Sequence, residues 1–541
     1  MSDDRVEIAE AMATTLERAG DNLPPLFIDN GNLPAVAKEL ATRLAAEPDL
    51  FDRRGPARLV KDSVTGGLIV QPLNRHMVLN LAHEHCQPIM VKATKQGAQR
   101  QRVTLPLPIA DLYLARGGDN ELRPLDGITS APLLSADGTI LTATGYQAES
   151  RMCCEAVPAL AIPERPTEAE ARAALGRMRF RLRSFCFADA ATRPEAGYGA
   201  PVVDLAQPPG LDESSALVAV MTAVCRASLD LAPGLVVRGA ALTGAGAGKG
   251  LLVRVVCAIA FGRPPSATTA GHSAEELDKR VSTALASAES VLFLDNVNSA
   301  TLASPVLASA LTESPAKVRL LGASAEVRLN ARAFVAITGN ALTLGEDLAR
   351  RFLVVELDAK TEDPEARRFP GDLLFEVAAD RAALLADVLT IWRWGVQRGD
   401  ALPQGQPLGS FGRWARWCRD PLLALGCRDP VERLAALKAA DPHRRAMLEI
   451  YTAWQKAHGD RAVAASELDD SVTQLIDPRL SRQALAAKVA QMVGTRIGGW
   501  TLVAIDPAGR WSAKLYRLVR GAVSVATATP PTREEMIDAL L

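Results

Sequence analysis

Short apolar runs alternate with helical sequence along the middle of the chain. Such runs, mostly followed by Gly, Asn or Asp, are typical of buried strands; they cover residues 235–242, 290–295, 318–321, 327–329, 334–338 and 352–357. Helical sequence lies between several of them, most clearly at residues 249–261. Because strands separated by helices usually form a parallel sheet covered by helices, residues 231–400 are predicted to form an α/β core.

The sequence before this core is less regular. Residues 1–165 mix short helical and strand-like pieces, so we expect an N-terminal α/β domain there, with a role that the sequence does not indicate. A stretch containing Pro163 and Pro166 follows, and residues 166–230 predict a helical lead-in to the core.

The sequence after the core predicts further structure. Residues 408–460 are expected to form a helical segment. Residues 461–520 contain two helical stretches and then two strand-like runs, joined by the turn sequence Asp506-Pro507-Ala508-Gly509. Helices followed by a two-stranded wing predict a winged-helix domain, and residues 521–541 are expected to be a tail.

Composition is typical of a globular protein. The chain has 541 residues, 48% of them hydrophobic, and a net charge of -1. It has no apolar stretch of about twenty residues and no basic-then-apolar start, so we expect no membrane span, no signal peptide and a cytoplasmic location. The eight cysteines show no paired spacing. Adjacent positions in His83-Glu84-His85-Cys86 point about 100° apart on a helix, so no metal site is expected there.

A glycine-rich turn separates the strand at 235–242 from the helix at 249–261. Alternate glycines followed by Lys let backbone N–H groups surround a polyphosphate at a helix N-terminus. We expect this turn to bind ATP, with Lys249 on the β- and γ-phosphates; a glycine-rich linker is the alternative. The residues of the turn are Thr243, Gly244, Ala245, Gly246, Ala247, Gly248, Lys249 and Gly250.

Two positions of this turn depart from the usual phosphate-loop pattern. Thr243 takes the place of the first glycine. Gly250 takes the place of the Ser or Thr whose hydroxyl normally binds magnesium, so more of the coordination of Mg²⁺ would fall to other residues.

The strand-like run at 290–295 ends in a carboxylate. At the carboxyl edge of a parallel sheet Asp295 would lie beside the nucleotide, so we expect it to contact Mg²⁺, directly or through water. A capping Asp at a strand end is the alternative. Many ATPase motors have Glu at the next position, where this chain has Asn296. Either Asn296 positions the attacking water, or a carboxylate from elsewhere, with Glu276 the first candidate, completes the site.

Two later motifs add polar groups to the core. The run at 334–338 is followed by Gly339 and Asn340, whose amide is expected to sense the γ-phosphate or align water; an ordinary turn is the alternative. Arg350 and Arg351 precede the run at 352–357. One of these arginines could act as an arginine finger, which contacts the ATP bound by a neighbouring subunit. A surface pair or an internal salt bridge is the alternative.

The ordered series of phosphate loop, Asp295-Asn296, Thr338-Gly339-Asn340 and Arg350-Arg351 resembles the superfamily 3 DNA helicases of the AAA+ class. It is most similar to the helicase part of phage-type primase-helicases from prophages and integrated elements. In that family an Asn ends the third motif, as Asn340 does. The likeness covers roughly residues 124–520, with the specific motifs in the middle.

The resemblance implies an AAA+ P-loop ATPase core that forms a hexameric ring, with ATP between subunits. A hairpin before the third motif would project into the pore and grip one DNA strand. The two short runs at 318–321 and 327–329 lie at that place, and a solvated hairpin is the alternative. The candidate DNA-binding cations are Lys317, Arg319, Arg328 and, beside the hairpin, Arg332.

A basic surplus marks the expected winged helix. Residues 477–520 contain eight Lys or Arg residues and two Asp residues. Arg482 and Lys488 lie on the expected recognition helix, and Arg510 and Lys514 at the expected wing. Duplex DNA is the expected partner, and a solvated basic face is the alternative.

The expected function is an ATP-dependent DNA helicase for replication of a phage or integrated element, with ATP and Mg²⁺ as cofactors. Its expected partners are DNA, further copies in a hexamer and other replication proteins, without a membrane. Before residue 165 we find no carboxylate set typical of a primase. The alternative, favoured by Gly250 and Asn296, is a DNA-binding AAA+ switch that hydrolyses slowly and unwinds nothing. A small-molecule kinase would leave Asn340 and the winged helix unexplained.

Overall fold

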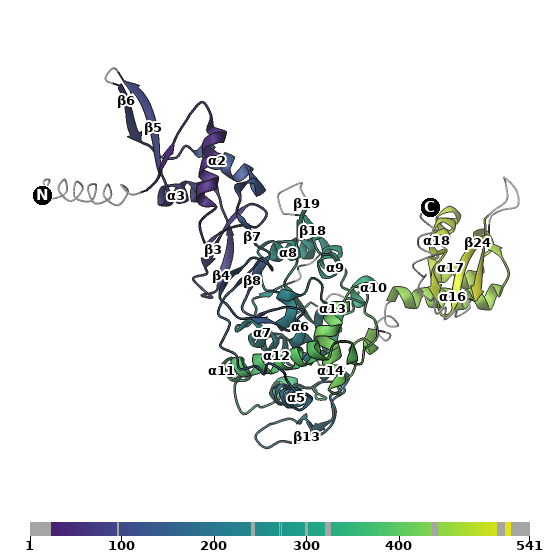
Figure 1. The fold of residues 1–541 in the computed structure, drawn as a ribbon. Coiled ribbons are helices and arrows are strands. Elements are labelled where there is room, and N and C mark those ends of the chain that lie inside the picture. Colours follow the sequence, from purple (N-terminus) through teal and green to yellow (C-terminus); the bar gives the residue numbers. More distant parts are fainter. Residues whose placement is uncertain are drawn as a thin grey trace, which may run out of the picture. The chain divides into compact units, whose positions relative to one another are not determined.

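The computed structural model (Figure 1) divides the chain into two compact units, Met1–Leu434 and Ala435–Leu541. It describes residues 23–94, 97–239, 244–269, 271, 273–297, 301–319, 326–434, 442–505 and 514–520. Each unit contains a hydrophobic core of its own. No helix within the described ranges is long and apolar enough to cross a membrane.

A five-stranded sheet organises the first unit. The strand order is β16-β17-β20-β15-β21, and every neighbouring pair is parallel. The mixed α/β class predicted for the core is therefore confirmed. The strands are β15 (Gly234–Gly239), β16 (Ala267–Thr268), β17 (Val291–Leu294), β20 (Phe334–Asn340) and β21 (Phe352–Leu357).

The predicted elements of the core lie close to the observed ones. Strand β21 and helix α7 (Lys249–Phe261) have the expected bounds, and β17 and β20 differ from theirs by one or two residues at an end. Strand β15 is seen as far as Gly239; residues 240–243, which include Thr243, lie outside the described part of the chain. The runs at 318–321 and 327–329 belong to a separate antiparallel hairpin, β18 (Ala316–Arg319) and β19 (Glu326–Leu329).

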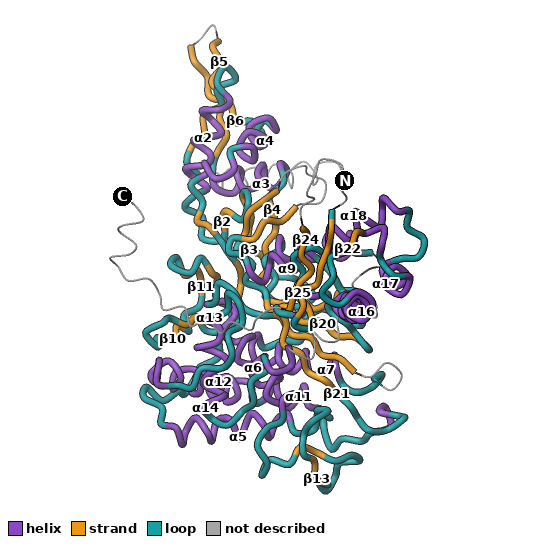
Figure 2. The backbone as a smooth tube through the Cα atoms, turned by 90° about the vertical axis from the view of Figure 1, so that its right-hand side faces the viewer, coloured by secondary structure: helices purple, strands orange, loops and turns teal. Residues whose placement is uncertain are grey.

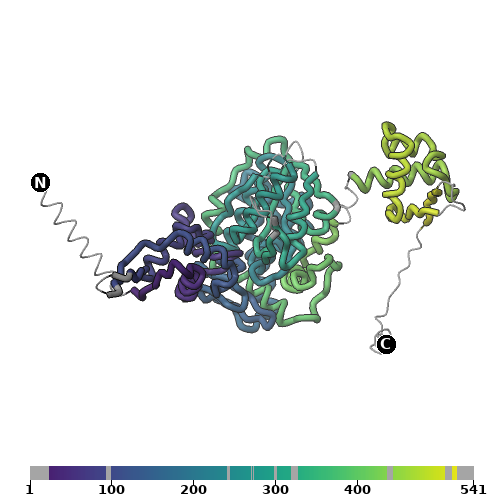
Figure 3. The backbone as a smooth tube through the Cα atoms, turned by 90° about the horizontal axis from the view of Figure 1, so that it is seen from above, coloured from purple at the N-terminus to yellow at the C-terminus, as the bar shows by residue number. Residues whose placement is uncertain are grey.

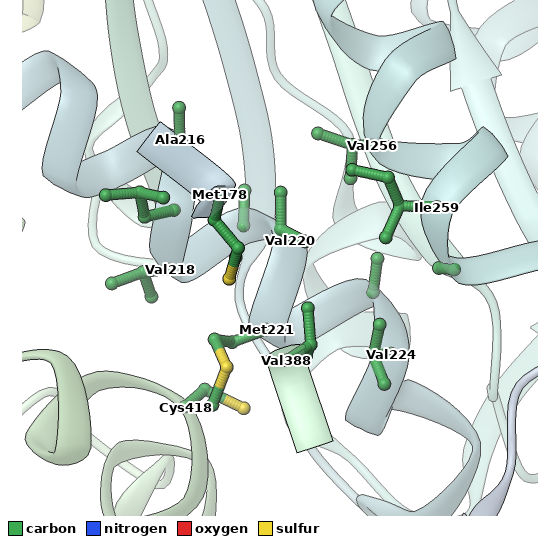
Figure 4. Packing of buried hydrophobic residues seen from close by; sticks show 14 of the residues in the cluster. Met178, Ala216, Val218, Val220, Met221, Val224, Val256, Ile259, Val388 and Cys418 are labelled. Atoms are coloured by element: carbon green, nitrogen blue, oxygen red, sulfur yellow. The ribbon is translucent and has the colours of Figure 1, made fainter. Parts of the chain in front are cut away.

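Helix α6 (Leu211–Cys225) is buried along its whole length. From Ala216 to Cys225 its residues are apolar except for Thr222, which is typical of a helix inside a core. Helices α7 and α12 (Arg381–Arg398) pack against it, and α5 (Glu168–Leu182) packs against α12. Figure 4 shows their side chains meeting around Val220 and Met221 of α6. This packing fixes α7, whose first residue is Lys249.

Shorter helices complete the core region of the first unit. Figure 2 shows α14 close to α12, and α14 also packs against α6. The shorter elements are α8 (Ala274–Ala286), α9 (Pro305–Thr312), α10 (Glu346–Ala349), η3 (Pro364–Ala366), α11 (Leu373–Ala379), η4 (Gly399–Ala401), α13 (Gly412–Trp414), the π-helical turn η5 (Ala415–Arg419) and α14 (Asp420–Ala424).

The N-terminal part of the first unit has smaller sheets and a separate apolar cluster. A sheet of order β1-β5-β6 accompanies three helices that pack around Leu40, Leu81 and Ile109. These elements are β1 (Pro25–Phe27), α2 (Leu33–Leu44), α3 (Arg75–His85), β5 (Gln87–Thr94), β6 (Gly97–Arg102) and α4 (Leu107–Ala115).

Further short strands connect this part to the core. A sheet of order β4-β3-β2-β7 contains β2 (Leu50–Asp52), β3 (Pro56–Lys61), β4 (Leu68–Pro72) and β7 (Arg123–Pro124). The other short elements of the first unit, some of which lie within the core region, are η1 (Gly117–Asn120), β8 (Gly127–Thr129), β9 (Leu133–Leu134), β10 (Ile140–Leu141), β11 (Gly145–Gln147), β12 (Met152–Cys154), β13 (Thr192–Arg193), β14 (Val202–Val203) and η2 (Arg226–Ser228).

Buried arginines join the N-terminal part to the core. The Arg53 guanidinium donates to the carbonyls of Asp126 and Leu285, both at 2.8 Å, and burial lowers the pKa of Arg53 to about 10. Residues on both sides of position 165 therefore belong to one compact unit. The structure also divides the helical segment expected at 408–460: α13 and α14 lie in the first unit, and α16 (Pro442–His458) lies in the second. The other domain bounds expected from the sequence, such as those near residues 165, 230 and 400, stay predictions.

The second unit (yellow in Figure 3) combines helices with an antiparallel sheet of order β22-β25-β24-β23. Its core includes Tyr451, Trp454, Leu502 and Leu518. The two helical stretches and the two strand-like runs expected within residues 461–520 are observed, and the expected turn at residues 506–509 lies outside the described part of the chain. The elements are α16 (Pro442–His458), β22 (Val463–Ala464), η6 (Ala465–Glu467), α17 (Asp470–Ile476), α18 (Arg482–Met492), β23 (Arg496–Ile497), β24 (Trp500–Ile505) and β25 (Leu515–Arg520).

One buried hydrogen bond of the first core is suited to a stability test. Trp414 Nε1 donates to Thr222 Oγ1 of α6 at 2.8 Å. Thr222→Val keeps the volume but leaves the buried indole N–H without its acceptor, so we expect the free energy of unfolding to fall by about 1–3 kcal/mol. Thr283→Val, which removes an exposed hydroxyl of α8, should change it by less than about 0.5 kcal/mol. Urea unfolding of the full chain, followed by fluorescence, compares the two variants; equal effects would contradict the prediction.

Candidate phosphate site at the carboxyl edge of the sheet

The glycine-rich turn follows β15 and leads directly into α7. Its described residues begin at Gly244; Gly246 and Gly248 have φ values of 69° and 93°, in the left-handed region that glycine adopts without strain. The turn passes close to the end of β15, since a Cβ on Gly239 would lie 3.0 Å from the Cα of Gly244. Because α7 begins at Lys249, the unpaired N–H groups of its first turn lie at this carboxyl edge.

Lys249 places its ammonium group inside the turn. Its Nζ donates a hydrogen bond to the Gly244 carbonyl. Burial lowers the pKa of Lys249, and the nearby carboxylate of Asp295 opposes that shift. The ammonium of Lys249 therefore lies in the electrostatic field of Asp295.

Strand β20 lies between β15 and β17, so its carboxyl end separates the glycine-rich turn from Asp295. Thr338 Oγ1 donates to Asp295 Oδ1 at 2.5 Å and accepts a hydrogen bond from Asn296 N at 2.9 Å. Asn340 is the register partner of Gly239, the last described residue before the turn. The structure thus brings Lys249, Asp295, Asn296 and Asn340 to one edge. Thr338 was not among the predicted site residues, although the Thr-Gly-Asn motif contains it.

Gly339 allows the two strand ends to approach each other. The Val297 carbonyl oxygen lies only 2.2 Å from where a Cβ on Gly339 would be. Val297 N in turn donates to the Thr338 carbonyl at 2.7 Å. A side chain at position 339 would therefore separate β20 from the segment that carries Asp295.

Gly250 faces Asp295 across the start of α7. A Cβ at this position would lie 3.6 Å from Asp295 Oδ1 and 2.7 Å from Arg254 Nη1. Arg254 Nη2 lies 3.6 Å from Asp295 Oδ2, and the guanidinium lies over the ring of Phe293, 5.6 Å from its centroid. The space beside the missing side chain of Gly250 is thus occupied by an arginine that sequence reasoning did not select.

The oxygen donors at this edge allow contact with a nucleotide-bound magnesium ion. Mg²⁺ is commonly held by one or two carboxylates, the phosphates of the nucleotide and water. Asp295 offers a carboxylate, and Gly250 offers no hydroxyl. No cluster of three or more His, Cys, Asp or Glu residues suited to a metal ion occurs within the described ranges. Glu276, the other candidate carboxylate, pairs with Arg280 one turn along α8.

A cavity of about 450 Å³ lies beside the turn, within the range typical of small-molecule sites. The Tyr198 and Phe369 rings lie 6.5 Å apart, and Arg367 Nη2 donates to the Gly246 carbonyl at 3.3 Å. These residues come from separate segments, so no local sequence pattern indicated them. The lining includes Arg183, Phe185, Tyr198, Gly246, Arg367 and Phe369.

Arg350 and Arg351 lie away from this edge. Both pair with Asp347, at 2.7 and 2.9 Å, and the Arg350 side chain is 58% exposed. The Arg351 carbonyl accepts from Gly234 N, at the amino end of β15. The five residue steps from Gly234 to Gly239 span about 17 Å of strand, so this pair lies at the sheet edge opposite the phosphate turn of its own chain.

The hairpin brings two predicted DNA-binding residues together. Lys317 and Arg328 are register partners across β18 and β19, and both are exposed. Like charges directly opposite each other repel, so an anion beside them would be stabilising. Arg319 belongs to β18, but its side chain lies outside the described part. Arg332 instead pairs with Asp230 at 3.0 Å.

The second unit exposes most of its predicted cations. Arg482 and Lys488 are exposed on α18, and Lys514 is exposed just before β25. Arg510 lies outside the described residues. The exposed Arg479, Arg496 and Arg517 add to the positive charge of this unit.

Comparisons with known proteins add little to this site. No family model matches the chain, and no curated protein matches it. Among solved structures, one chain described as "SCCmec type IV Cch - active helicase" aligns with 88% of this chain and 97% of its own length, at 11% identity and a TM-score of 0.30. Likeness at this level carries no argument about function.

Gly339 provides a test of the junction between β17 and β20. Gly339→Ala would place its Cβ against the Val297 carbonyl, so we expect a loss of at least about 2 kcal/mol in the free energy of unfolding. Gly176→Ala, in the exposed interior of α5 with nothing within 4 Å, should instead stabilise by about 0.5–1 kcal/mol. Urea titration of both variants measures the signs; a neutral Gly339→Ala would show that the junction is not tight.

Proposed function

We propose that this chain is an ATP-dependent DNA helicase of the superfamily 3 type, with an AAA+ core that hydrolyses ATP at the carboxyl edge of its parallel sheet. The observation that carries the proposal is the junction of Thr338 with Asp295 beside the turn that holds Lys249. It combines a cation and backbone N–H groups for phosphates with a carboxylate placed for a metal or water.

ATP would lie with its triphosphate along residues 244–250. Lys249 would exchange the Gly244 carbonyl for β- and γ-phosphate oxygens, and the base would enter the aromatic-lined cavity beside Gly246. A magnesium ion bound with the nucleotide would neutralise charge that develops on the phosphates. Asp295 would face that ion, and Asn340 would face the γ-phosphate.

Hydrolysis would take place between subunits. Arg350 and Arg351 lie at the sheet edge opposite their own phosphate turn, so only the nucleotide of another copy is within their reach. A guanidinium supplied by a neighbour can stabilise the charge of the transferred phosphoryl group. This geometry supports a closed ring of identical chains, for which we propose a hexamer by resemblance.

DNA would contact two places on each chain. Lys317 and Arg328 on the hairpin would grip a single strand in the ring, and Arg319 would join them. In the second unit, α17 and α18 followed by β23, β24 and β25 have the element order of a winged helix, with α18 as recognition helix. Arg482, Lys488, Lys514 and Arg510 would then contact duplex phosphates. We propose replication of a phage or integrated element as the setting, by resemblance alone, with the other replication proteins as partners.

A second candidate is a DNA-binding AAA+ switch that binds ATP but turns it over slowly. It is favoured by Asn296, whose amide cannot act as a general base, and by Gly250. DNA-stimulated ATP turnover by the full chain distinguishes the two functions: a rate indistinguishable from zero favours the switch, and a DNA-dependent rate favours the helicase.

Lys249→Ala tests the phosphate site. Because it removes the cation that would neutralise the transferred phosphate, we expect turnover and ATP-dependent strand separation to fall by about 100-fold or more. Lys279→Ala removes an exposed lysine of α8 that pairs with Glu275, and should leave both unchanged. Phosphate release and forked-DNA unwinding are the assays. Strand separation that persists in Lys249→Ala would contradict the mechanism.

The winged-helix proposal predicts a change in salt dependence. Removing one cation that binds a DNA phosphate should lower the slope of log affinity against log salt by about 0.9. We therefore expect Arg482→Ala and Lys488→Ala each to weaken binding of duplex DNA to the full chain and to reduce that slope. Lys456→Ala, on the exposed surface of α16, serves as the control. Fluorescence anisotropy at several salt concentrations measures the slopes; identical slopes in all variants would exclude α18 as the DNA-binding helix.

A further inference from the structure

Gly250 and Arg254 form a pair on the first turns of α7. Side chains on a helix lean towards its N-terminus, so a residue at i+4 covers the surface beside residue i. Arg254 does this: its Nη1 lies 2.7 Å from the Cβ position of Gly250. A side chain at position 250 would require the guanidinium, which is the end of a flexible side chain, to shift. The absence of a side chain at position 250 therefore leaves room for the guanidinium at its present place.

The guanidinium is held at the phosphate edge of the sheet. It lies over the ring of Phe293, two residues before Asp295, and its Nη2 is 3.6 Å from Asp295 Oδ2. This distance is that of an ion pair and exceeds a hydrogen bond, so N–H donors of Arg254 are available for another oxygen. The side chain of Arg254 is 35% exposed, which leaves it open to a ligand.

We propose that Arg254 binds the phosphates of the nucleotide in place of the missing loop hydroxyl and its metal contact, so that this chain binds ATP with little need for Mg²⁺. The inference rests on the proposed ATP site and deepens it. A guanidinium presents several N–H donors in a fixed plane and matches phosphate oxygens in two-point contacts. Together with Lys249, it supplies two cations to the triphosphate, while it also faces the carboxylate of Asp295.

The proposal separates binding from hydrolysis. A fixed guanidinium neutralises phosphate charge without a metal, so affinity should survive chelation of Mg²⁺. Chemistry at the γ-phosphate would still use the ion that arrives with the nucleotide. The test therefore measures affinity rather than turnover.

The experiment measures equilibrium binding of a fluorescent ATP analogue to the full chain, in Mg²⁺ and in EDTA. Unmodified protein should bind in EDTA with an affinity within about tenfold of that in Mg²⁺. Arg254→Gln should lower the affinity for the analogue by about tenfold or more in EDTA and by a clearly smaller factor in Mg²⁺. Arg263 lies just beyond α7 and pairs with Glu155. Arg263→Gln removes this cation and should bind the analogue with the affinity of the unmodified chain in both buffers.

A reciprocal exchange tests the pairing of the two positions. Gly250→Ser alone should displace the guanidinium and reduce affinity in EDTA, as Arg254→Gln does. Gly250→Ser combined with Arg254→Gln restores a loop hydroxyl and has no guanidinium to displace, so binding should become strongly dependent on Mg²⁺. Arg254→Lys keeps the charge without the planar donors, so its affinity in EDTA should lie between that of Arg254→Gln and that of the unmodified chain. Thermal unfolding of each variant verifies the fold, and Arg254→Lys serves as the test if Arg254→Gln does not fold.

The outcomes distinguish this proposal from the ATP site on which it depends. Two results would overturn the role of Arg254 as a substitute for the metal contact and leave the ATP site standing. One is unmodified protein that binds the analogue only with Mg²⁺. The other is an Arg254→Gln variant whose affinity falls by the same factor in both buffers. Failure of the unmodified chain to bind in either buffer would overturn both.

Discussion

The hydrogen bond between the Thr338 hydroxyl and Asp295 is the contact on which the candidate site depends. Thr338 is 1% exposed, and it links the carboxyl ends of β20 and β17 while β20 also pairs with β15. The carboxylate, the amide of Asn340 and the glycine-rich turn are therefore held by three adjacent strands. Gly339 is required because the Val297 carbonyl oxygen lies only 2.2 Å from the position of a Cβ. The same parallel sheet places Arg350 and Arg351 at its opposite edge.

Most elements of the core could be predicted from the sequence, because strands buried in a parallel sheet are continuous apolar runs bounded by turn residues. The bounds of α7 and β21 followed from such runs. The strand order did not, since it depends on the paths of the crossovers and not on any local pattern. The expected helical segment at 408–460 is divided between two units because α13 and η5 pack against the core around Trp414, which contacts Thr222 of α6.

The candidate site was only partly visible in the sequence. Lys249, Asp295 and Asn340 stand in motifs whose spacing indicates a phosphate site. Thr338 lies in the same motif, but its role as a bridge requires the register between β17 and β20. Arg254 could have been found from its position four residues after Gly250, because a missing side chain leaves room for a long one at that spacing. The cavity aromatics come from segments far apart in sequence, so only the fold brings them together.

The most direct test of the account is the structure of the full chain by electron microscopy, with a slowly hydrolysed ATP analogue and forked DNA. We predict a ring in which each triphosphate lies along residues 244–250, with Lys249 within about 3 Å of phosphate oxygens and a neighbour's Arg350 or Arg351 directed at the γ-phosphate. The hairpin carrying Lys317 and Arg328 should face the DNA strand in the pore. A nucleotide bound elsewhere, or an empty turn at saturating analogue, would contradict the central claim.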